Sequence, residues 1–316
     1  MELKQLRYFV GVSEAGSLLK ASSSLHIAQP ALGQQISSLE EELGVRLFDR
    51  STRGMALTPA GRIFLDHAKV VLTDADRAKD AVRHSASEPQ GQVVIGLPTT
   101  VALAAAVPIV KACRERYPCI HLKVIEAYSG FLREWLQIGR LDLALLFGDE
   151  PDSDLLKRVL LEERLALVAA PSHSPLPKTI RLHQMTGMEL VLPGKEHGLR
   201  KIIDEVCLQH GIHLKVGAEI DSLTIVKKAV ANGIGSTILS ESSVIDEVML
   251  GHLRASTISD SAMKRRVVCA TSITRPTTLA GAAVIGLAIE LIHGMVESGS
   301  WPAQWIGEPI PSKRTA

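Results

Sequence analysis

The stretch HIAQPALGQQISSLEEELGVRLFDR, residues 26–50, decides how the N-terminal part of the chain folds. Its apolar residues recur at steps of four, three and four, which predicts a helix with a single apolar stripe made of Leu32, Ile36, Leu39 and Leu43. We expect this helix to start near Gln29-Pro30, because proline suits a first turn, and to end at Gly44.

A second helix is expected just before this stretch. Gly16-Ser17 interrupts the preceding apolar pattern and offers a cap, and residues 26–28 leave only a tight connection between the two helices. The small residue Ala21 stands where the helices would cross. This spacing is typical of a helix-turn-helix. The segment that follows, with RSTRG (50–54) between VRLF and MALT, predicts a small hairpin, or wing, with a basic tip.

A long helix is predicted over residues 58–85, with Thr58 as its cap and Pro59 in its first turn. Its apolar residues alternate at steps of four and three, the period of a coiled-coil seam. A single helix packed on its own domain is the alternative. We expect a dimerisation surface formed by Phe64, Ala68, Val71, Ala75, Ala78 and Val82.

After a small, polar linker at 85–92, the pattern changes to alternating strands and helices, which is typical of an α/β fold built from βαβ units. Strands are expected at 93–97, 121–127, 141–147, 164–170, 189–193, 215–220, 236–240 and 265–271. Helices are expected at 101–116, 130–139, 199–211, 223–233 and 279–297. About 205 residues is large for one such sheet, so two lobes are expected. The tail, 301–316, lacks periodicity, and we expect it to be loosely ordered.

Composition limits the class of protein. The 316 residues carry a formal net charge of only +1, so any nucleic-acid site must be local. The start, MELKQLRYFV, does not have the pattern of a signal peptide, and stretches such as LDLALLF are too short to cross a membrane. The four cysteines are scattered, without a C-x-x-C pair or zinc spacing. We therefore expect a cytoplasmic protein with reduced thiols, no metal and no cofactor.

An enzyme is not expected either. The sequence contains no G-x-S-x-G elbow, P-loop, H-E-x-x-H or G-x-G-x-x-G, and Gly233-Ile234-Gly235 is too short for a dinucleotide site.

Residues 21–61, ASSSLHIAQPALGQQISSLEEELGVRLFDRSTRGMALTPAG, resemble the N-terminal signature of LysR-type transcriptional regulators. GLPTT, YP-x-I-x-L, LDLALLF and ANGIGSTIL stand where that family has its effector domain, and HIAQPAL-x-QQ is similar to the branch that contains the nitrogen assimilation control regulator. The resemblance implies a winged helix-turn-helix domain at 1–58, a dimerising linker helix and hinge at 59–90, and an effector-binding domain at 91–300, like periplasmic binding proteins. Lobe I would comprise about 91–162 and 266–300, lobe II about 163–265, with a tail at 301–316.

The resemblance also implies a function. Such proteins form homodimers that assemble to homotetramers, bind an interrupted inverted repeat near a promoter, and change their DNA contacts when a small-molecule effector binds. An activator would also contact RNA polymerase. The alternative is a non-specific architectural DNA-binding protein, for which strong basicity would be expected.

The recognition helix, about Gln29–Glu40, would enter the major groove. Glutamine amides pair with adenine for ~1–3 kcal/mol of discrimination, and small apolar groups contact a thymine methyl, so the candidate base readers are Gln29, Pro30, Ala31, Gln34 and Gln35. Relatives often have serine and arginine where this chain has Gly33 and Gln34. Gly33 either brings the helix closer to the groove or is tolerated drift. Candidate phosphate contacts are Lys20, Arg50 and Arg53, whereas Glu40, Glu41 and Glu42 are expected on a solvated face.

The effector site is expected where strands end and helices begin. Thr99 and Thr100 follow the first strand and Ser129-Gly130 the second, and the resemblance places ligand contacts at both. Phe147 closes a crossover. On the other lobe, we expect His197 and Arg200 to pair with a carboxylate; helix caps and a surface ion pair are the alternatives. Ser240 stands where relatives often have proline.

Overall fold

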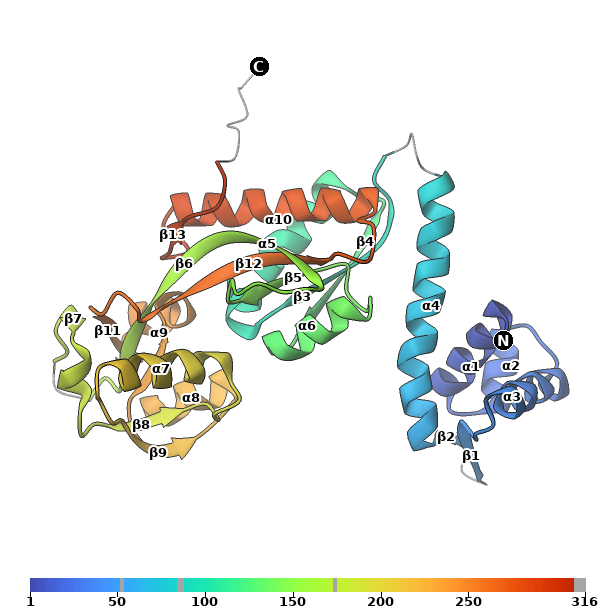
Figure 1. The fold of residues 1–316 in the computed structure, drawn as a ribbon, viewed down its shortest axis with the longest axis horizontal. Helices are drawn as coiled ribbons and strands as arrows, with labels where there is room; N and C mark the ends of the chain where they lie inside the picture. The colour runs from blue at the N-terminus through green and yellow to red at the C-terminus, as the bar shows by residue number, and fades with distance from the viewer. Residues whose placement is uncertain (52–53, 84–87, 173–174, 310–316) are drawn as a thin grey trace, which may run out of the picture. The chain divides into compact units, whose positions relative to one another are not determined.

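The computed structural model describes residues 1–51, 54–83, 88–172 and 175–309 (Figure 1). Residues 1–88 form one compact unit, and residues 89–137 and 141–316 form another. Each unit has its own hydrophobic core.

The first unit contains α1 (Leu3–Ala15), α2 (Leu18–Ser24), α3 (Gln29–Leu43), β1 (Phe48–Ser51), β2 (Gly54–Leu57) and α4 (Pro59–Arg83). The predicted start and end of α3 are confirmed, since Pro30 lies in its first turn and Gly44 closes it in the left-handed conformation at φ 68°. Gly16 ends α1 in the same way at φ 61°.

The core of this unit is built around Phe9. This side chain is fully buried, and its ring lies 5.2 Å from that of Phe48 and 5.0 Å from that of Phe64. The apolar stripe of α3 packs into the same cluster through Leu32, Ile36 and Leu39, with Leu43 partly buried. One stripe is thus committed to the core and leaves the opposite face of α3 exposed.

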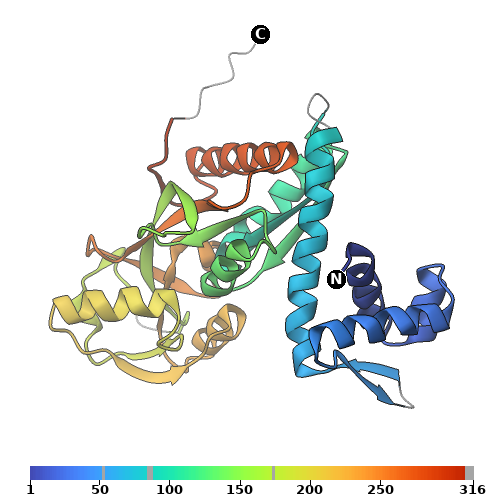
Figure 2. The ribbon, with the colours of Figure 1, turned by 45° about the vertical axis from the view of Figure 1, so that its right-hand side comes forward.

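The predicted wing is confirmed as an antiparallel hairpin in which Phe48 pairs with Leu57 and Ser51 with Gly54 (Figure 2). Glu40 stabilises the start of this hairpin. The Oε1 atom of Glu40 accepts hydrogen bonds from the amides of Leu47, at 2.7 Å, and Phe48, at 3.0 Å. The expectation that Glu40 lies on a solvated face is wrong, because the chain reverses at Gly44 and brings β1 back to the end of α3.

The long helix α4 starts as predicted. Thr58 Oγ1 accepts from the amide of Gly61 at 2.9 Å and donates to the carbonyl of Arg46 at 2.7 Å, which joins the cap to the wing. The expected dimer seam is wrong at Ala68, which is only 1% exposed in the core of its own unit. Phe64 packs against the same core but is half-buried, so its expected contact in a dimer stays a prediction.

The remaining seam positions differ from those two. Val71 and Ala78 are exposed and Ala75 is half-buried, so this part of the stripe is not used by the core of the unit. The side chain of Val82 lies outside the described residues.

The second unit contains β3 (Gly91–Leu97), α5 (Thr99–Arg116), β4 (Ile120–Glu126), α6 (Ser129–Gln137), β5 (Leu143–Phe147), β6 (Leu155–Ala169), β7 (Thr179–Ile180), η1 (Leu182–Met185), β8 (Glu189–Leu192), α7 (Gly198–Gln209), β9 (Lys215–Glu219), α8 (Leu223–Ala231), β10 (Thr237–Ser240), η2 (Glu241–Ser243), α9 (Ile245–Met249), β11 (Arg254–Ile258), β12 (Lys264–Ser272), α10 (Leu279–Glu297) and β13 (Gln304–Trp305).

Two lobes share this unit, and β6 joins them (Figure 1). Lobe I is the sheet β4-β3-β5-β12-β6, with α5 and α10 in the core on one face and α6 in the core on the other. In lobe II, residues 165–169 of β6 pair with β10 and β11, and β8 pairs with β9. The two cores are separate, so the lobes are packed independently on one continuous strand.

The sequence predicted only the second half of β6, at 164–170. The first half, 155–163, was missed because charged residues interrupt its apolar pattern: Lys157, Arg158, Glu162 and Glu163. Tertiary pairing with β12 makes this half a strand.

The loosely ordered tail expected from residue 301 is wrong for its first part. Trp301 is 1% exposed within the core of lobe I, and β13 pairs with β6, Gln304 opposite Glu162 and Trp305 opposite Leu161. The segment is too short to show periodicity, and its order comes from contacts with β6. Residues 310–316 lie outside the described part. The helix before it, α10, is long and apolar enough to span a membrane by length and composition, but its buried face belongs to the lobe I core.

Glu40→Ala should weaken the wing, because two amides would lose a charged acceptor. We expect the free energy of unfolding of the first unit to fall by about 1–3 kcal/mol, measured by urea unfolding, and the amides of Leu47 and Phe48 to exchange hydrogen faster. Glu41→Ala, at an exposed position one residue away, is the control. Equal losses in both variants would contradict the role given to Glu40.

Candidate functional site

The N-terminal half of α3 presents an exposed polar face. Among the expected base readers, Gln29, Pro30, Ala31 and Gln34 are exposed and Gln35 is half-buried. A Cβ added at Gly33 would meet nothing within 4 Å, so the fold of the unit does not require glycine there. The structure therefore leaves the predicted face free for contact.

The expected phosphate contacts are described less completely. Lys20 is exposed on α2. The side chain of Arg50 and the whole of Arg53 lie outside the described residues, so their expected role at the wing stays a prediction.

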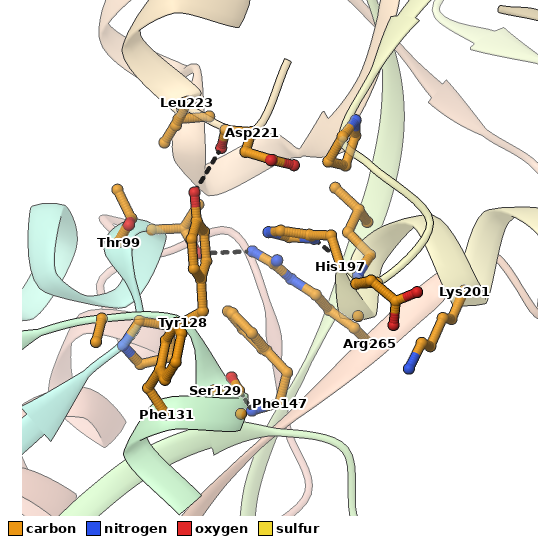
Figure 3. Close-up of a pocket in the computed structure, with 18 of the residues that line it drawn as sticks. Thr99, Tyr128, Ser129, Phe131, Phe147, His197, Lys201, Asp221, Leu223 and Arg265 are labelled. Carbon is orange, nitrogen blue, oxygen red and sulfur yellow. Dashed lines mark hydrogen bonds between the residues drawn. The ribbon is translucent and has the colours of Figure 1, made fainter. Parts of the chain in front are cut away.

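A cavity of about 540 Å³ lies in the second unit, where residues of both lobes meet (Figure 3). Four helix N-termini face it. They contribute Thr99 and Thr100 from α5, Ser129 and Gly130 from α6, His197 and Gly198 at the start of α7, and Leu223 from α8. The first turn of a helix has unpaired N–H groups and the positive end of the helix dipole, so this arrangement favours a negative group.

Arg265 of β12 forms one side of this cavity. Its guanidinium reaches between His197 and Phe147 toward Tyr128 (Figure 3). The carbon at its centre lies 3.8 Å from the centroid of the Phe147 ring, which is a cation–π contact. Nη2 donates at 2.9 Å to Thr100 Oγ1 of lobe I and at 2.9 Å to Ser240 Oγ of lobe II.

Glu163 is the counterion of Arg265. It stands opposite Arg265 in the β6–β12 pairing, and its Oε2 accepts from Arg265 Nε at 2.7 Å. Both side chains are buried, with exposed fractions of 1% for Glu163 and 3% for Arg265. Nη1 of Arg265 makes no hydrogen bond within the described part of the chain, so it is free to bind a ligand that enters the cavity.

Tyr128 and His197 come from opposite lobes and meet at the cavity. Tyr128 donates its hydroxyl to the carbonyl of Asp221 at 3.2 Å, and its ring lies 5.4 Å from the imidazole of His197, edge to face. His197 Nδ1 caps α7 by accepting from the amide of Leu199 at 3.1 Å. Burial, with Arg265 nearby, lowers the pKa of His197 from its usual 6.5, so the site presents a neutral imidazole beside a cationic guanidinium.

Most of the residues expected at an effector site line this cavity: Thr99, Thr100, Ser129, Gly130, Phe147 and His197. Arg200 does not, and its expected place in the cleft is wrong. It is 6% exposed, and its guanidinium donates to the Pro193 carbonyl at 3.0 Å and to Asp204 and Glu219 at 2.9 Å. On α7, the helical period places position 201 over position 197, and Lys201 therefore lines the cavity instead.

Sequence reasoning missed Arg265, Tyr128 and Asp221. The signal for Arg265 was present: RRVVCAT was read as a strand, and an arginine at the start of a buried strand needs a partner. The identity of that partner was not readable, because Glu163 lies 102 residues away. Across the described residues, no group of three or more His, Cys, Asp or Glu side chains could hold a metal ion.

Comparison with known families covers most of the chain. The model of the LysR substrate binding domain matches residues 86–291, and that of the bacterial regulatory helix-turn-helix proteins of the lysR family matches residues 3–62.

Individual proteins similar to this chain are also transcriptional regulators. The chain is 35% identical over 244 residues to the nitrogen assimilation regulatory protein nac of Klebsiella aerogenes, covering 77% of this chain and 79% of that protein. It is 32% identical over 303 residues to the HTH-type transcriptional regulator BbuR of Bordetella bronchiseptica, covering 94% and 92%.

Solved structures show the same fold. Full-length CbnR complexed with its target DNA superposes with a TM-score of 0.69 at 23% identity, covering 93% of this chain and 99% of that one. A full-length OxyR variant from Pseudomonas aeruginosa superposes with a TM-score of 0.70 at 22% identity, covering 98% and 99%. With a helix-turn-helix at one end and the LysR substrate-binding fold over the rest, this chain belongs to the LysR family of DNA-binding transcriptional regulators with effector-binding domains.

Proposed function

We propose that this regulator reads promoter DNA with the exposed face of α3 and changes its DNA contacts when a small anionic effector binds between the two lobes. The observation that carries the proposal is Arg265, a buried guanidinium in the cavity with one amino group unpaired within the described part of the chain, surrounded by four helix N-termini.

The cavity favours an effector with a carboxylate and an apolar body. Arg265 offers the N–H groups of Nη1, since Nε and Nη2 already donate to Glu163, Thr100 and Ser240, and Thr99, Ser129 and the helix amides add further donors for a carboxylate. The rest of the lining is largely apolar: the rings of Tyr128, Phe131 and Phe147, with Leu199, Ile220, Leu223, Val226 and Leu239. An aromatic or branched monocarboxylate fits both halves of this description.

Acidic side chains also line the cavity, and they limit where the anion binds. Glu134, Glu196 and Asp221 are all exposed, so solvent screens their charge. Asp221 already accepts a hydrogen bond from the amide of Gly194 at 2.9 Å. The effector's negative charge therefore belongs at the Arg265 end, and a polar group that can donate hydrogen bonds suits the acidic rim.

Effector binding would act on the lobes. Arg265 hydrogen-bonds Thr100 of lobe I and Ser240 of lobe II through one amino group, and Tyr128 of lobe I donates to Asp221 of lobe II. A ligand that binds one arrangement of the lobes more tightly shifts the population toward it. This is the physical basis we propose for the change in DNA contacts.

The DNA contacts follow the exposed face of α3. Glutamine amides at 29, 34 and 35 would read adenines in an interrupted inverted repeat, with Pro30 and Ala31 against thymine methyls. Lys20, Arg50 and Arg53 would contact phosphates. A dimer would place two such helices on the two half-sites, through the apolar part of α4 that its own core leaves exposed, at Val71 and Ala78.

The proposed assembly rests on the family to which the chain belongs. We propose a homodimer that assembles to a homotetramer, acts in the cytoplasm without catalytic activity, and contacts RNA polymerase where it activates.

The test of the proposal is a thermal-shift screen of small carboxylates on the full-length chain, followed by DNA footprinting with and without each compound that binds. We expect at least one aromatic or branched carboxylate to raise the melting temperature and to change the extent of the footprint. A footprint that no bound compound alters would overturn the switch.

Arg265→Lys should weaken effector binding. A lysine keeps the charge, but its ammonium has only three N–H groups, and Glu163, Thr100 and Ser240 can take up all of them. The donors of Nη1 are then lost, so we expect the dissociation constant of the carboxylate to rise at least about tenfold, measured by calorimetry. Arg266→Lys is the matched control, because Arg266 is the next residue on β12 and its exposed side chain pairs with Asp149 and Glu162. An equal loss of carboxylate affinity in both variants would mean that Arg265 does not bind the effector.

Gln34→Arg should make DNA binding more dependent on salt. An added phosphate contact steepens the slope of log K against log salt by ~0.9, which fluorescence anisotropy can measure on a duplex selected from random DNA. Gln34→Met, of similar size without charge, should leave the slope unchanged. A Gln34→Arg variant with the parent slope would count against contact between this face and DNA.

The lowered pKa of His197 predicts a pH dependence. Below about pH 6.5 the unfolded chain takes up a proton that the folded site disfavours. The free energy of unfolding should therefore fall as the pH drops through 6.5. His197→Asn keeps a good helix cap but does not titrate, so its unfolding free energy should change less between about pH 7.5 and 5.5 in urea titrations. The same pH dependence in both proteins would mean that His197 is not held neutral.

A further inference from the structure

Trp301 is the largest fully buried side chain in the described part of the chain. It belongs to the short segment that follows the last long helix, α10. After α10 the chain returns to β6 and pairs with it as β13, opposite Leu161 and Glu162. The C-terminal segment thus lies next to the residue on β6 that pairs with Arg265.

The indole of Trp301 touches that residue directly. Its Nε1 donates to Glu163 Oε1 at 2.8 Å, and Ser242 donates its hydroxyl to the same oxygen. The other oxygen, Oε2, accepts from Arg265 Nε at 2.7 Å. One buried carboxylate is therefore held by three donors from three separate parts of the chain.

We propose that Trp301 is a positioning residue for Arg265. Its indole N–H fixes the rotation of the Glu163 carboxylate, and that carboxylate fixes the guanidinium that the cavity presents to an anion. The inference rests on the proposed role of Arg265 as the anion-binding group. It makes the C-terminal segment part of effector recognition, although Trp301 itself does not line the cavity.

The reason is electrostatic. At an exposed fraction of 1%, water cannot replace a donor that Glu163 loses. An unsatisfied lone pair on a buried charge is costly, so the carboxylate would rotate to share its remaining donors, Ser242 and Arg265. Because Arg265 also bonds Thr100 and Ser240, this rotation shifts its guanidinium relative to both lobes.

The competing explanation is that Trp301 only fills space in the core of lobe I. The two explanations separate at the N–H group, because filling space requires the ring but not the donor. We therefore choose two variants: Trp301→Phe, and the full-length chain carrying 3-benzothienylalanine at position 301. The second keeps the shape of the indole and replaces only N–H by sulfur, so it folds around the same bulk.

Trp305 supplies the matched control. It lies four residues further on in the same segment, its Nε1 donates to the carbonyl of Glu308 at 3.3 Å, and its ring lies 4.8 Å from that of His293. Trp305→Phe therefore removes an indole from the segment without removing a donor to Glu163.

The first measurement needs no ligand. In NMR spectra of the full-length chain, the Nε–H resonance of Arg265 is assigned by its loss in Arg265→Lys. We expect this resonance to shift and to exchange faster with water in both variants at 301, and to stay in place in Trp305→Phe. An unchanged resonance in the benzothienyl variant overturns the inference, whatever binds in the cavity.

The second measurement uses benzoate, the simplest aromatic carboxylate, in calorimetric titrations. We expect its dissociation constant to rise about fivefold to tenfold in both variants at 301, and to stay within about twofold in Trp305→Phe. A shifted resonance with unchanged benzoate affinity would overturn the link to recognition. If the parent protein binds no benzoate, the proposed carboxylate chemistry of the effector fails, and the resonance alone decides whether Trp301 positions Arg265.

Discussion

The ion pair between Glu163 and Arg265 is the interaction on which the second unit depends. It joins β6 to β12 at the point where β6 passes from one lobe to the other. A buried ion pair costs desolvation energy, and it is stable only when hydrogen bonds satisfy the charges on both sides. Here Glu163 accepts from Trp301, Ser242 and Arg265, and Arg265 donates onward to Thr100 and Ser240. The pair therefore fixes a cation at the junction of two independently packed cores.

That fixed cation explains why the cavity suits a regulator. The ring of Phe147 contacts the guanidinium, Glu163 accepts a hydrogen bond from its Nε, and four helix N-termini line the cavity that it enters. An anion would meet donors that are already oriented, so little ordering is needed on binding. Because the same arginine bonds both lobes, a ligand bound to it would act on their arrangement, and this is the link between a small molecule and the DNA contacts that we propose.

In the first unit, a single core decides which face of α3 stays exposed. The apolar stripe of α3 and the first part of the α4 stripe are used by one core around Phe9, which leaves the polar face of α3 exposed. Glu40 belongs to the same design: a carboxylate at the end of α3 binds the amides at the base of the wing. The base of the wing is therefore tied to the helix that carries the candidate base readers.

The sequence by itself determined the features that depend on neighbours along the chain: the start and end of α3, the Thr58 cap, the hairpin, and the strand ends where Thr99, Ser129 and His197 meet the cavity. Periodicity and capping residues report these because each acts within a turn or two of helix. Only the tertiary structure decided which side of α7 faces the cavity, that Ala68 serves its own core, and that Arg265 and Trp301 meet at Glu163. Those partners lie 102 and 138 residues from Glu163, and no local pattern encodes a contact at that separation.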